Sequence, residues 1–269
     1  MDSVQEKIVE NNLVARMEIL EIKNCTKRFG GLVAVKGLSL SLNQGDLYGL
    51  IGPNGAGKTT VFNLITGVYR VDEGTIELEG RNLRGLKPSG IASLGMSRTF
   101  QNIRLFQSMT VLENVKLASH LRKKQGLIDA VLRTSRLKKE EAEIENRTLE
   151  LLRVFGLEKR ADELAGNLPY GSQRRLEIAR ALATNPKVLL LDEPAAGMNP
   201  QESMELIERI RWIRDHFQIT ILLVEHNMNV VMGVCERIQV IDYGETIAIG
   251  SPKEIQDNPK VIEAYLGGA

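Results

Sequence analysis

The sequence has little with which to build a disulfide framework, a metal-thiolate site or a membrane span. Its 269 residues include only two cysteines, Cys25 and Cys235, which lie far apart in the chain. Two such distant cysteines make neither pattern, and their scarcity is typical of a reducing cytoplasm. No apolar run approaches the roughly 18 residues of a transmembrane helix, and the polar, acidic first residues are not a secretory signal. We therefore expect a soluble protein that reaches any membrane through a partner.

Net charge is also nearly absent. The 35 Lys and Arg residues are offset by 34 Asp and Glu, which leaves a formal charge of +1. No whole-molecule field therefore attracts nucleic acid or anionic lipid, and we expect no nucleic-acid partner. A hydrophobic content of 43% is enough for one large α/β domain or two closely associated subdomains.

The order of local patterns predicts a β-rich start, a helical middle and a return to α/β structure. Residues 1–16 carry no strong period and are expected to be an N-terminal extension. Strands separated by turn signals are then predicted over residues 18–22, 32–35, 38–42, 47–51 and 74–80. Residues 109–183 are helix-like. The charged run over 121–150 predicts a solvated helix face rather than a nucleic-acid surface, because acidic residues are interleaved throughout.

The last third of the chain shows the pattern of a parallel sheet. Continuous apolar runs over residues 188–191 and 219–224 are typical of central parallel strands covered on both faces. Between them, residues 201–216 space their apolar side chains on one helical face. Residues 237–250 predict a hairpin around Asp242-Tyr243-Gly244, and a final helix is predicted over 255–266.

One glycine-rich stretch carries the strongest chemical signal. It reads Gly52-Pro53-Asn54-Gly55-Ala56-Gly57-Lys58-Thr59-Thr60. It lies between the strand predicted at 47–51 and a helix predicted at 59–66, which is the context of a P-loop. Glycines let backbone N–H groups turn around a phosphate, and the helix N-terminus adds the positive end of its dipole. Lys58 is expected to neutralise the β/γ oxygens and Thr59 to bind Mg²⁺. The alternative is a glycine-rich turn without a ligand.

Polar side chains follow both of the central apolar runs. Asp192 ends the first run and is expected to reach Mg²⁺ at the phosphate crevice. Glu193 is expected to point at the attacking water, the alternative being a charge at the start of the following helix. His226 follows the second run and is expected to hold water and Glu193 beside the γ-phosphate, although a lone histidine is more often a satisfied polar residue.

Five ordered segments resemble the nucleotide-binding subunit of an ATP-binding cassette (ABC) transporter. They are residues 52–60, Thr99-Phe100-Gln101, residues 168–175 (Leu-Pro-Tyr-Gly-Ser-Gln-Arg-Arg), residues 189–194 (Leu-Leu-Leu-Asp-Glu-Pro) and His226. The resemblance covers about residues 17–266. Within this family, residues 98–106, 195–200 and 258–267 are similar to the branched-chain amino acid import ATPases.

The resemblance implies an α/β fold: a P-loop NTPase core with a peripheral antiparallel β subdomain and an inserted helical subdomain. The core would comprise residues 17–100 and 187–269, and the helical subdomain residues 101–186. It also implies an ATPase that energises uptake of branched-chain or related amino acids from the cytoplasmic face of the membrane. Its partners would be two membrane permease subunits, a second ATP-binding subunit, identical or not, and indirectly an external solute-binding protein. The ATPase of a lipid or polysaccharide exporter and a non-transport ABC ATPase are the alternatives.

Several site roles follow from the resemblance alone. Two chains would sandwich ATP and Mg²⁺, and the contact with the other chain's ATP would come from Tyr170, Gly171, Ser172 and Gln173. Gln101 would contact Mg²⁺ and the attacking water, and Phe29 would stack on adenine unless it is a core aromatic. Leu105 and Phe106 would either line the permease docking groove or pack beneath the helical subdomain.

Two positions depart from the wider family. Pro169 stands where a serine hydroxyl usually touches the facing γ-phosphate. Ser172 would substitute for that hydroxyl or only cap the helix. Asn199 stands where aspartate is common, which leaves the coupling between the two subunits open.

Overall fold

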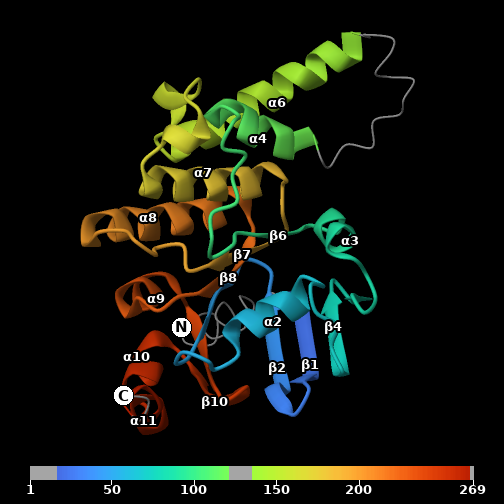
Figure 1. The fold of residues 1–269 in the computed structure, drawn as a ribbon, viewed down its shortest axis with the longest axis vertical. Helices are drawn as coiled ribbons and strands as arrows, with labels where there is room; N and C mark the ends of the chain where they lie inside the picture. Colours follow the sequence, from blue (N-terminus) through green and yellow to red (C-terminus); the bar gives the residue numbers. More distant parts are fainter. Residues whose placement is uncertain (1–16, 121–134, 267–269) are drawn as a thin grey trace, which may run out of the picture.

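The protein is described by a computed structural model over residues 17–120 and 135–266. Two sheets and their covering helices make up this part of the chain (Figure 1). The predicted N-terminal extension, residues 1–16, and residues 121–134 of the predicted charged helix face lie outside the described residues.

The smaller sheet is antiparallel. Its strands, in the spatial order β2-β1-β4-β5, are β2 (Leu32–Asn43), β1 (Glu18–Phe29), β4 (Glu73–Leu78) and β5 (Arg81–Asn82). The prediction of two separate strands at 32–35 and 38–42 is wrong, because β2 is continuous. Asn24 and Gly37 adopt left-handed φ angles of 48° and 58° where the β1–β2 register shifts. Such irregularities absorb the break in the apolar pattern without ending the pairing.

The larger sheet carries the parallel core. Its strands, in the order β10-β9-β3-β8-β7-β6, are β10 (Glu245–Gly250), β9 (Arg237–Asp242), β3 (Leu47–Ile51), β8 (Thr220–Val224), β7 (Val188–Asp192) and β6 (Met96–Arg98). All neighbours are parallel except β10, which forms the predicted hairpin with β9. Strands β3, β7 and β8 are buried along their whole length, as their continuous apolar runs predicted.

Helices cover both faces of this sheet (Figure 1). The helices of the described residues are α2 (Lys58–Ile65), α3 (Pro88–Ser93), α4 (Val111–His120), α6 (Ser135–Val154), α7 (Tyr170–Ala183), α8 (Pro200–Phe217), α9 (Met228–Val234), α10 (Pro252–Gln256) and α11 (Pro259–Leu266), of which α6 lies on α4 and α7 rather than on the sheet. The single final helix predicted over 255–266 is wrong. Pro259 disfavours helical geometry at Asn258, whose side chain accepts hydrogen bonds from the Lys260 and Val261 amides and so begins a new helix.

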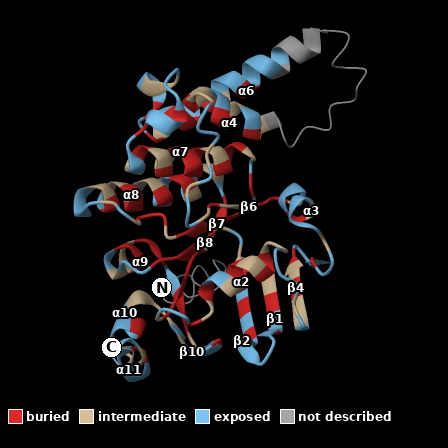
Figure 2. Ribbon diagram, in the orientation of Figure 1, coloured by how far each residue is buried: buried red, intermediate tan, exposed pale blue. Residues whose placement is uncertain are grey.

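Two hydrophobic clusters lie on opposite faces of the larger sheet. Leu189 and Leu191 of β7 join one cluster with α4, α6, α7 and α8, whereas Val188 and Leu190 join the other with α2 and the antiparallel sheet. This alternation follows from the two-residue period of a strand. Figure 2 shows the buried central strands and the largely exposed α6, which agrees with the solvated helix face predicted there. Within the described ranges, no helix has both the length and the apolar character needed to cross a bilayer.

Candidate active site

Four adjacent strands end at one edge of the larger sheet. β3 leads into the P-loop, β8 leads to His226, β7 ends at Asp192 and β6 leads to Gln101. Because parallel strands point the same way, the segments that follow them meet at this edge. A hollow of about 440 Å³ opens there, which we call the P-loop hollow. It is lined by Phe29, Leu32, Val33, Ala34, Asn54, Gly55, Ala56, Gly57, Lys58, Thr59, Thr60, Gln101, Glu193, His226 and Tyr243.

The P-loop depends on two glycines for its shape. A Cβ on Gly52, where φ is 154°, would lie 2.0 Å from the Ile241 carbonyl oxygen. A Cβ on Gly57, where φ is 104°, would lie 2.5 Å from the Ala34 carbonyl oxygen. Gly57 also precedes α2 and leaves its N-terminus without a side-chain cap. The first amides of α2 can therefore donate to an anion, and the helix dipole favours one.

Lys58 is held across the loop. It is only 6% exposed, and its Nζ donates to the carbonyl oxygens of Gly52 at 2.6 Å and Pro53 at 2.8 Å. Burial lowers the pKa of Lys58, while Glu193 and Asp192 oppose that shift. Among the described residues, the hydrogen-bond partners of Lys58 Nζ are these two neutral carbonyl groups, so its positive charge at the wall of the hollow favours a bound anion.

The carboxylate of Glu193 joins two other predicted site residues. Its Oε1 lies 2.7 Å from His226 Nε2, and its Oε2 accepts from Gln101 Nε2 at 3.2 Å. Since a carboxylate only accepts, the facing His226 nitrogen carries the proton. Glu193 is not part of α8, which begins at Pro200, so the alternative of a helix-terminal charge is wrong.

Asp192 is placed differently from its neighbour. It is 2% exposed, does not line the P-loop hollow, and its Oδ2 accepts from Arg98 Nη2 at 2.8 Å. Arg98 also donates to Asn63 Oδ1 of α2 at 2.7 Å. Sequence analysis missed this role of Arg98, although the residue directly precedes the Thr99-Phe100-Gln101 segment. The arginine fixes the carboxylate between β6, β7 and α2.

The donor set at this edge suits Mg²⁺. Asp192 keeps a second carboxylate oxygen, and the Thr59 hydroxyl and Gln101 amide belong to the P-loop hollow. The ion prefers oxygen ligands and commonly takes only one or two from protein when phosphates supply others. Among the described residues there is no group of three or more His, Cys, Asp and Glu that could hold a metal ion. Binding of Mg²⁺ here would therefore depend on the phosphates of a nucleotide.

Glu225 is a second residue that sequence analysis missed. It is 3% exposed and accepts from the amides of Ala195 at 2.7 Å, His226 at 3.0 Å and Asn227 at 3.2 Å. Burial raises the pKa of Glu225, and these amides oppose the rise. The side chain joins the segment after β7 to the segment after β8, and so helps to set the position of His226 against Glu193. Its place between an apolar run and His226 was the available signal.

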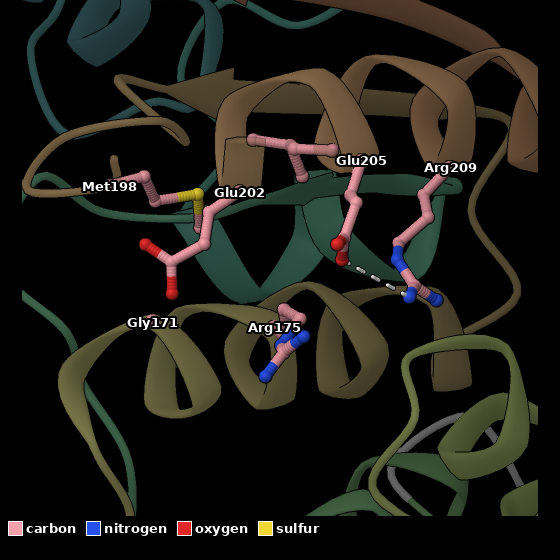
Figure 3. A pocket seen from close by; sticks show the side chains of 7 residues that line it. Gly171, Arg175, Met198, Glu202, Glu205 and Arg209 are labelled. Atoms are coloured by element: carbon pink, nitrogen blue, oxygen red, sulfur yellow. Dashed lines mark ion pairs between the residues drawn. The ribbon is translucent and has the colours of Figure 1, made fainter. Parts of the chain in front are cut away.

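The segment Tyr170, Gly171, Ser172 and Gln173 begins α7 and does not line the P-loop hollow. Pro169 is the N-cap, so the idea that Ser172 caps the helix is wrong. Ser172 is 5% exposed and its hydroxyl accepts from Arg175 at 3.0 Å, because it faces into the protein from the first turn. In Figure 3, the carboxylate of Glu202, in the first turn of α8, points toward Gly171 of α7, and Met198, which precedes α8, lies beside it.

Asn199 has a local structural role at this place. It is the N-cap of α8: its side chain accepts from the Glu202 amide at 2.9 Å, and the Glu202 carboxylate accepts from the Asn199 amide at 2.9 Å. Asparagine is as favourable as aspartate at such a cap. The departure from the family's usual aspartate is therefore compatible with the local fold.

A buried ion pair ties α7 to the segment that contains Gln101. Arg174 and Glu177 are 0% and 2% exposed and lie 2.8 Å apart. Arg174 donates to the carbonyl oxygens of Phe100 at 2.5 Å and Gln101 at 2.7 Å. Glu177 accepts from the amides of Phe100 and Arg104, both at 3.3 Å. Any movement of residues 100–104 is thus coupled to α7.

Phe29 and Phe106 lie at two different surfaces. Phe29 is 41% exposed at the P-loop hollow, so the core-aromatic alternative is wrong. Phe106 is 50% exposed and, with Leu105, lines a second, mainly apolar hollow of about 670 Å³, which we call the apolar hollow. Its other lining residues are Thr66, Val68, Pro88, Ile91, Ala92, Met96, Ser97, Arg98, Phe100, Arg104, Leu117, Ala118, Glu177, Arg180, Ala181 and Thr184.

Comparison with known proteins gives consistent matches. Residues 35–196 match the family model described as ABC transporter, and residues 245–269 match that described as branched-chain amino acid ATP-binding cassette transporter. The high-affinity branched-chain amino acid transport ATP-binding protein LivG of Salmonella typhimurium is 49% identical over 93% of this chain and 98% of that protein. BraF of Pseudomonas aeruginosa, described in the same words, is 45% identical over the same shares.

Solved structures agree with the fold. An ATP-binding cassette of an ABC transporter in its ADP conformation has a TM-score of 0.80 and 34% identity, over 93% of this chain and 99% of that one. A second cassette, solved as a dimer in a post-hydrolysis state with ADP and phosphate bound, has a TM-score of 0.74 and 26% identity, over 87% and 99%. The sheet order and helices described above are thus those of an ABC ATPase cassette.

Proposed function

The chain belongs to the ABC transporter family and is an ATPase of that family, and from this premise we propose that it energises the uptake of branched-chain amino acids. The match over residues 245–269 and the names of LivG and BraF support this cargo. They also favour an importer over the lipid or polysaccharide exporter and the non-transport ATPase.

The proposed catalytic group is Glu193. Hydrogen bonds from Gln101 and His226 to its two carboxylate oxygens, beside the P-loop, are the observation that carries this assignment. They hold the carboxylate where it can orient and polarise the water that attacks the γ-phosphate. Lys58 and the amides at the start of α2 would bind the phosphates. Mg²⁺, held by Thr59, Gln101 and Asp192, would neutralise charge on the phosphate oxygens.

ATP is proposed to bind between two subunits. Residues 170–173 do not line the P-loop hollow of their own chain, which leaves the N-terminus of α7 available to a nucleotide on a second subunit. Helix N-termini favour phosphate. The dimeric cassette bound to ADP and phosphate gives structural precedent for such pairing. The second subunit would be another copy or a related chain.

The apolar hollow is the proposed contact with the permease pair. It exposes Phe106 and Leu117, and its wall includes Phe100 next to Gln101. A permease segment seated there would press on residues 100–104, which Arg174 and Glu177 tie to α7. The subunit would thus be peripheral, at the cytoplasmic face of the membrane, and would meet the external solute-binding protein only through the permease.

Replacing Glu193 tests the catalytic assignment. We expect Glu193→Gln to lower ATP turnover about 10²- to 10⁴-fold, the usual contribution of a positioned base, while ATP with Mg²⁺ converts the protein to a dimer by light scattering. Glu208→Gln makes the same chemical change on the exposed face of α8 and is expected to keep wild-type turnover. A Glu193→Gln protein that hydrolyses ATP normally, or stays monomeric with ATP, would contradict the proposal.

The cargo is tested separately. The subunit is reconstituted with the permease pair and the solute-binding protein, and ATP turnover is measured with Leu, Ile or Val and with Asp or a lipid. Stimulation by the branched-chain amino acids alone is expected. Stimulation by lipid alone would favour the exporter.

A further inference from the structure

Tyr243 is an aromatic side chain at the P-loop hollow that neither the family motifs nor the proposed catalytic roles use. It lines that hollow together with Phe29, Gly57 and Lys58. Its side chain is 86% exposed, the largest fraction among the exposed large hydrophobic side chains of the described residues. An exposed aromatic gains little from burial in the free subunit, so the fold itself does not explain a tyrosine here.

The backbone at this position makes the tyrosine more unusual. Tyr243 and Gly244 form the two-residue loop between Asp242 of β9 and Glu245 of β10, with φ angles of 45° and 80°. Two positive φ angles in such a loop are characteristic of a type I′ turn, which favours Asn-Gly or Asp-Gly. A tyrosine is disfavoured in the left-handed region because its Cβ crowds the following carbonyl oxygen. Residues kept in such conformations cluster at ligand sites.

The turn is held firmly against the P-loop. The Gly244 amide donates to the Ala56 carbonyl oxygen at 2.9 Å, and the Gly244 carbonyl oxygen accepts from the Lys36 amide at 2.9 Å. A Cβ on Gly244 would lie 2.7 Å from the Ala34 carbonyl oxygen, and one on Gly57 would lie 3.6 Å from the Gly244 Cα. Tyr243 is therefore fixed beside the last glycine of the loop rather than on a free hairpin tip.

The P-loop hollow has two chemically distinct parts. Lys58, Thr59 and the α2 N-terminus supply positive charge and hydrogen-bond donors suited to phosphates. Phe29, Leu32, Val33 and Ala34 supply an apolar wall suited to a base or a sugar face. Gly244, which follows Tyr243 in the turn, is hydrogen-bonded to Ala56 of the P-loop and to Lys36 of β2, the strand that also carries Leu32, Val33 and Ala34.

We propose that Tyr243 binds the nucleoside part of ATP as a second aromatic contact besides Phe29. Its ring would pack on the purine or the ribose, and its hydroxyl could donate to a ribose oxygen. The inference rests on the proposed function of this hollow as the ATP site. It makes base and sugar recognition a joint property of the end of β1 and the β9–β10 turn.

The test separates the nucleoside from the phosphates. Binding of ATP and of inorganic tripolyphosphate, each with Mg²⁺, is measured by calorimetry for wild type, Tyr243→Phe and Tyr243→Asn. We expect Tyr243→Asn to weaken ATP binding about 2- to 10-fold, the range of one aromatic contact, and to leave tripolyphosphate binding unchanged. Tyr243→Phe should keep most of the ATP affinity, since the ring is retained.

A second turn supplies the matched control. Glu79 and Gly80 join β4 to β5 with φ angles of 49° and 73°, and neither residue lines the P-loop hollow. Glu79→Asn therefore makes a comparable turn substitution elsewhere, and we expect it to leave ATP affinity unchanged. Both Asn variants should keep nearly wild-type thermal stability, because asparagine tolerates the left-handed conformation and the ion pair with Lys187 that Glu79→Asn removes is exposed to solvent.

The outcomes are distinguishable. Equal ATP affinity of wild type and Tyr243→Asn, or equal weakening of ATP and tripolyphosphate, would overturn the role of Tyr243 alone. Wild-type protein that binds neither ligand would overturn the proposed site and this inference with it.

Discussion

At the scale of single residues, the site depends on a strained glutamate. Glu193 has a left-handed φ of 48°, and its amide donates to the Val224 carbonyl oxygen at 2.8 Å. Such strain persists only where surrounding bonds hold it. Here it aims one carboxylate at both Gln101 and His226. The contact between His226 and Glu193 confirms the sequence-based expectation, whereas the hydrogen bond from Gln101 to Glu193 was not predicted.

His226 gives a residue-scale prediction. Replacing it with alanine removes a hydrogen bond of 2.7 Å to the Glu193 carboxylate. Hydrogen bonds to charged groups contribute about 1.5–3 kcal/mol, so we expect turnover to fall about 10- to 100-fold while ATP affinity changes little. Steady-state turnover and nucleotide titration measure the two effects.

The control for this prediction is another histidine–glutamate pair. His216 of α8 lies 3.3 Å from Glu150 of α6. Both side chains are exposed, and neither lines the P-loop hollow. His216→Ala should keep wild-type turnover. Equal losses in the two variants would show that His226 acts only on general stability.

At the scale of elements, hydrogen bonds connect helix α7 to residues 100–104, the segment that carries Gln101 of the candidate active site. Its buried Arg174 holds the carbonyl oxygens of residues 100 and 101, and Glu177 holds the amides of 100 and 104. The helix therefore supports the Gln101 segment along its backbone. A change at α7 reaches Glu193 through that segment.

Arg174→Ala tests this element. It leaves Glu177 buried without its cation, and breaking a buried pair in this way costs about 3–5 kcal/mol. We expect the free energy of unfolding in urea to fall by about that amount. Arg160 and Glu163 provide a control, because they form an ion pair of the same i,i+3 spacing with side chains 36% and 44% exposed.

Arg160→Ala is expected to cost no more than about 1 kcal/mol, the range of exposed pairs. If both variants lose the same small amount, α7 does not hold the Gln101 segment through Arg174.

At the scale of the whole molecule, the reactivity of the two buried cysteines, Cys25 and Cys235, measures how tightly the native protein is packed around them. Burial raises the pKa of Cys25 to about 11 and that of Cys235 to about 12. The reactive form is the thiolate. We therefore expect iodoacetamide at pH 8 to modify neither cysteine in the native protein and both in urea, as measured by mass spectrometry. Rapid native labelling would contradict the packing of β1 or of residues 234–236.

The same shifts predict a pH dependence of stability. The thiols ionise near pH 9 when unfolded and at about 11 and 12 when folded, so above pH 9 the unfolded state binds fewer protons. Stability is then full below pH 9 and declines as pH rises toward 12. Urea unfolding at pH 8 and 10 should show this decline, and a Cys25→Ala, Cys235→Ala double variant should show less of it.

The sequence alone determined which residues form the P-loop and which segments form the buried strands. The P-loop carries its glycines, lysine and threonine within nine adjacent residues, and the apolar runs of β7 and β8 are readable because a strand buried on both faces must be apolar throughout. The resemblance then extended these motifs to the α/β cassette fold. Element ends were less readable: the break between α10 and α11 depends on one proline and a cap.

The sequence predicted that His226 meets Glu193, but only the tertiary structure decided the other contacts of the site. The sheet order β3-β8-β7-β6 differs from the chain order, so it brings His226, Glu193 and Gln101 together across long stretches of sequence. It also places Arg98 on Asp192, Arg174 beneath residues 100–101, and Tyr243 beside the P-loop. These contacts arise from pairing and packing between distant segments, whose free energies belong to the whole fold and leave no period or spacing in the local sequence.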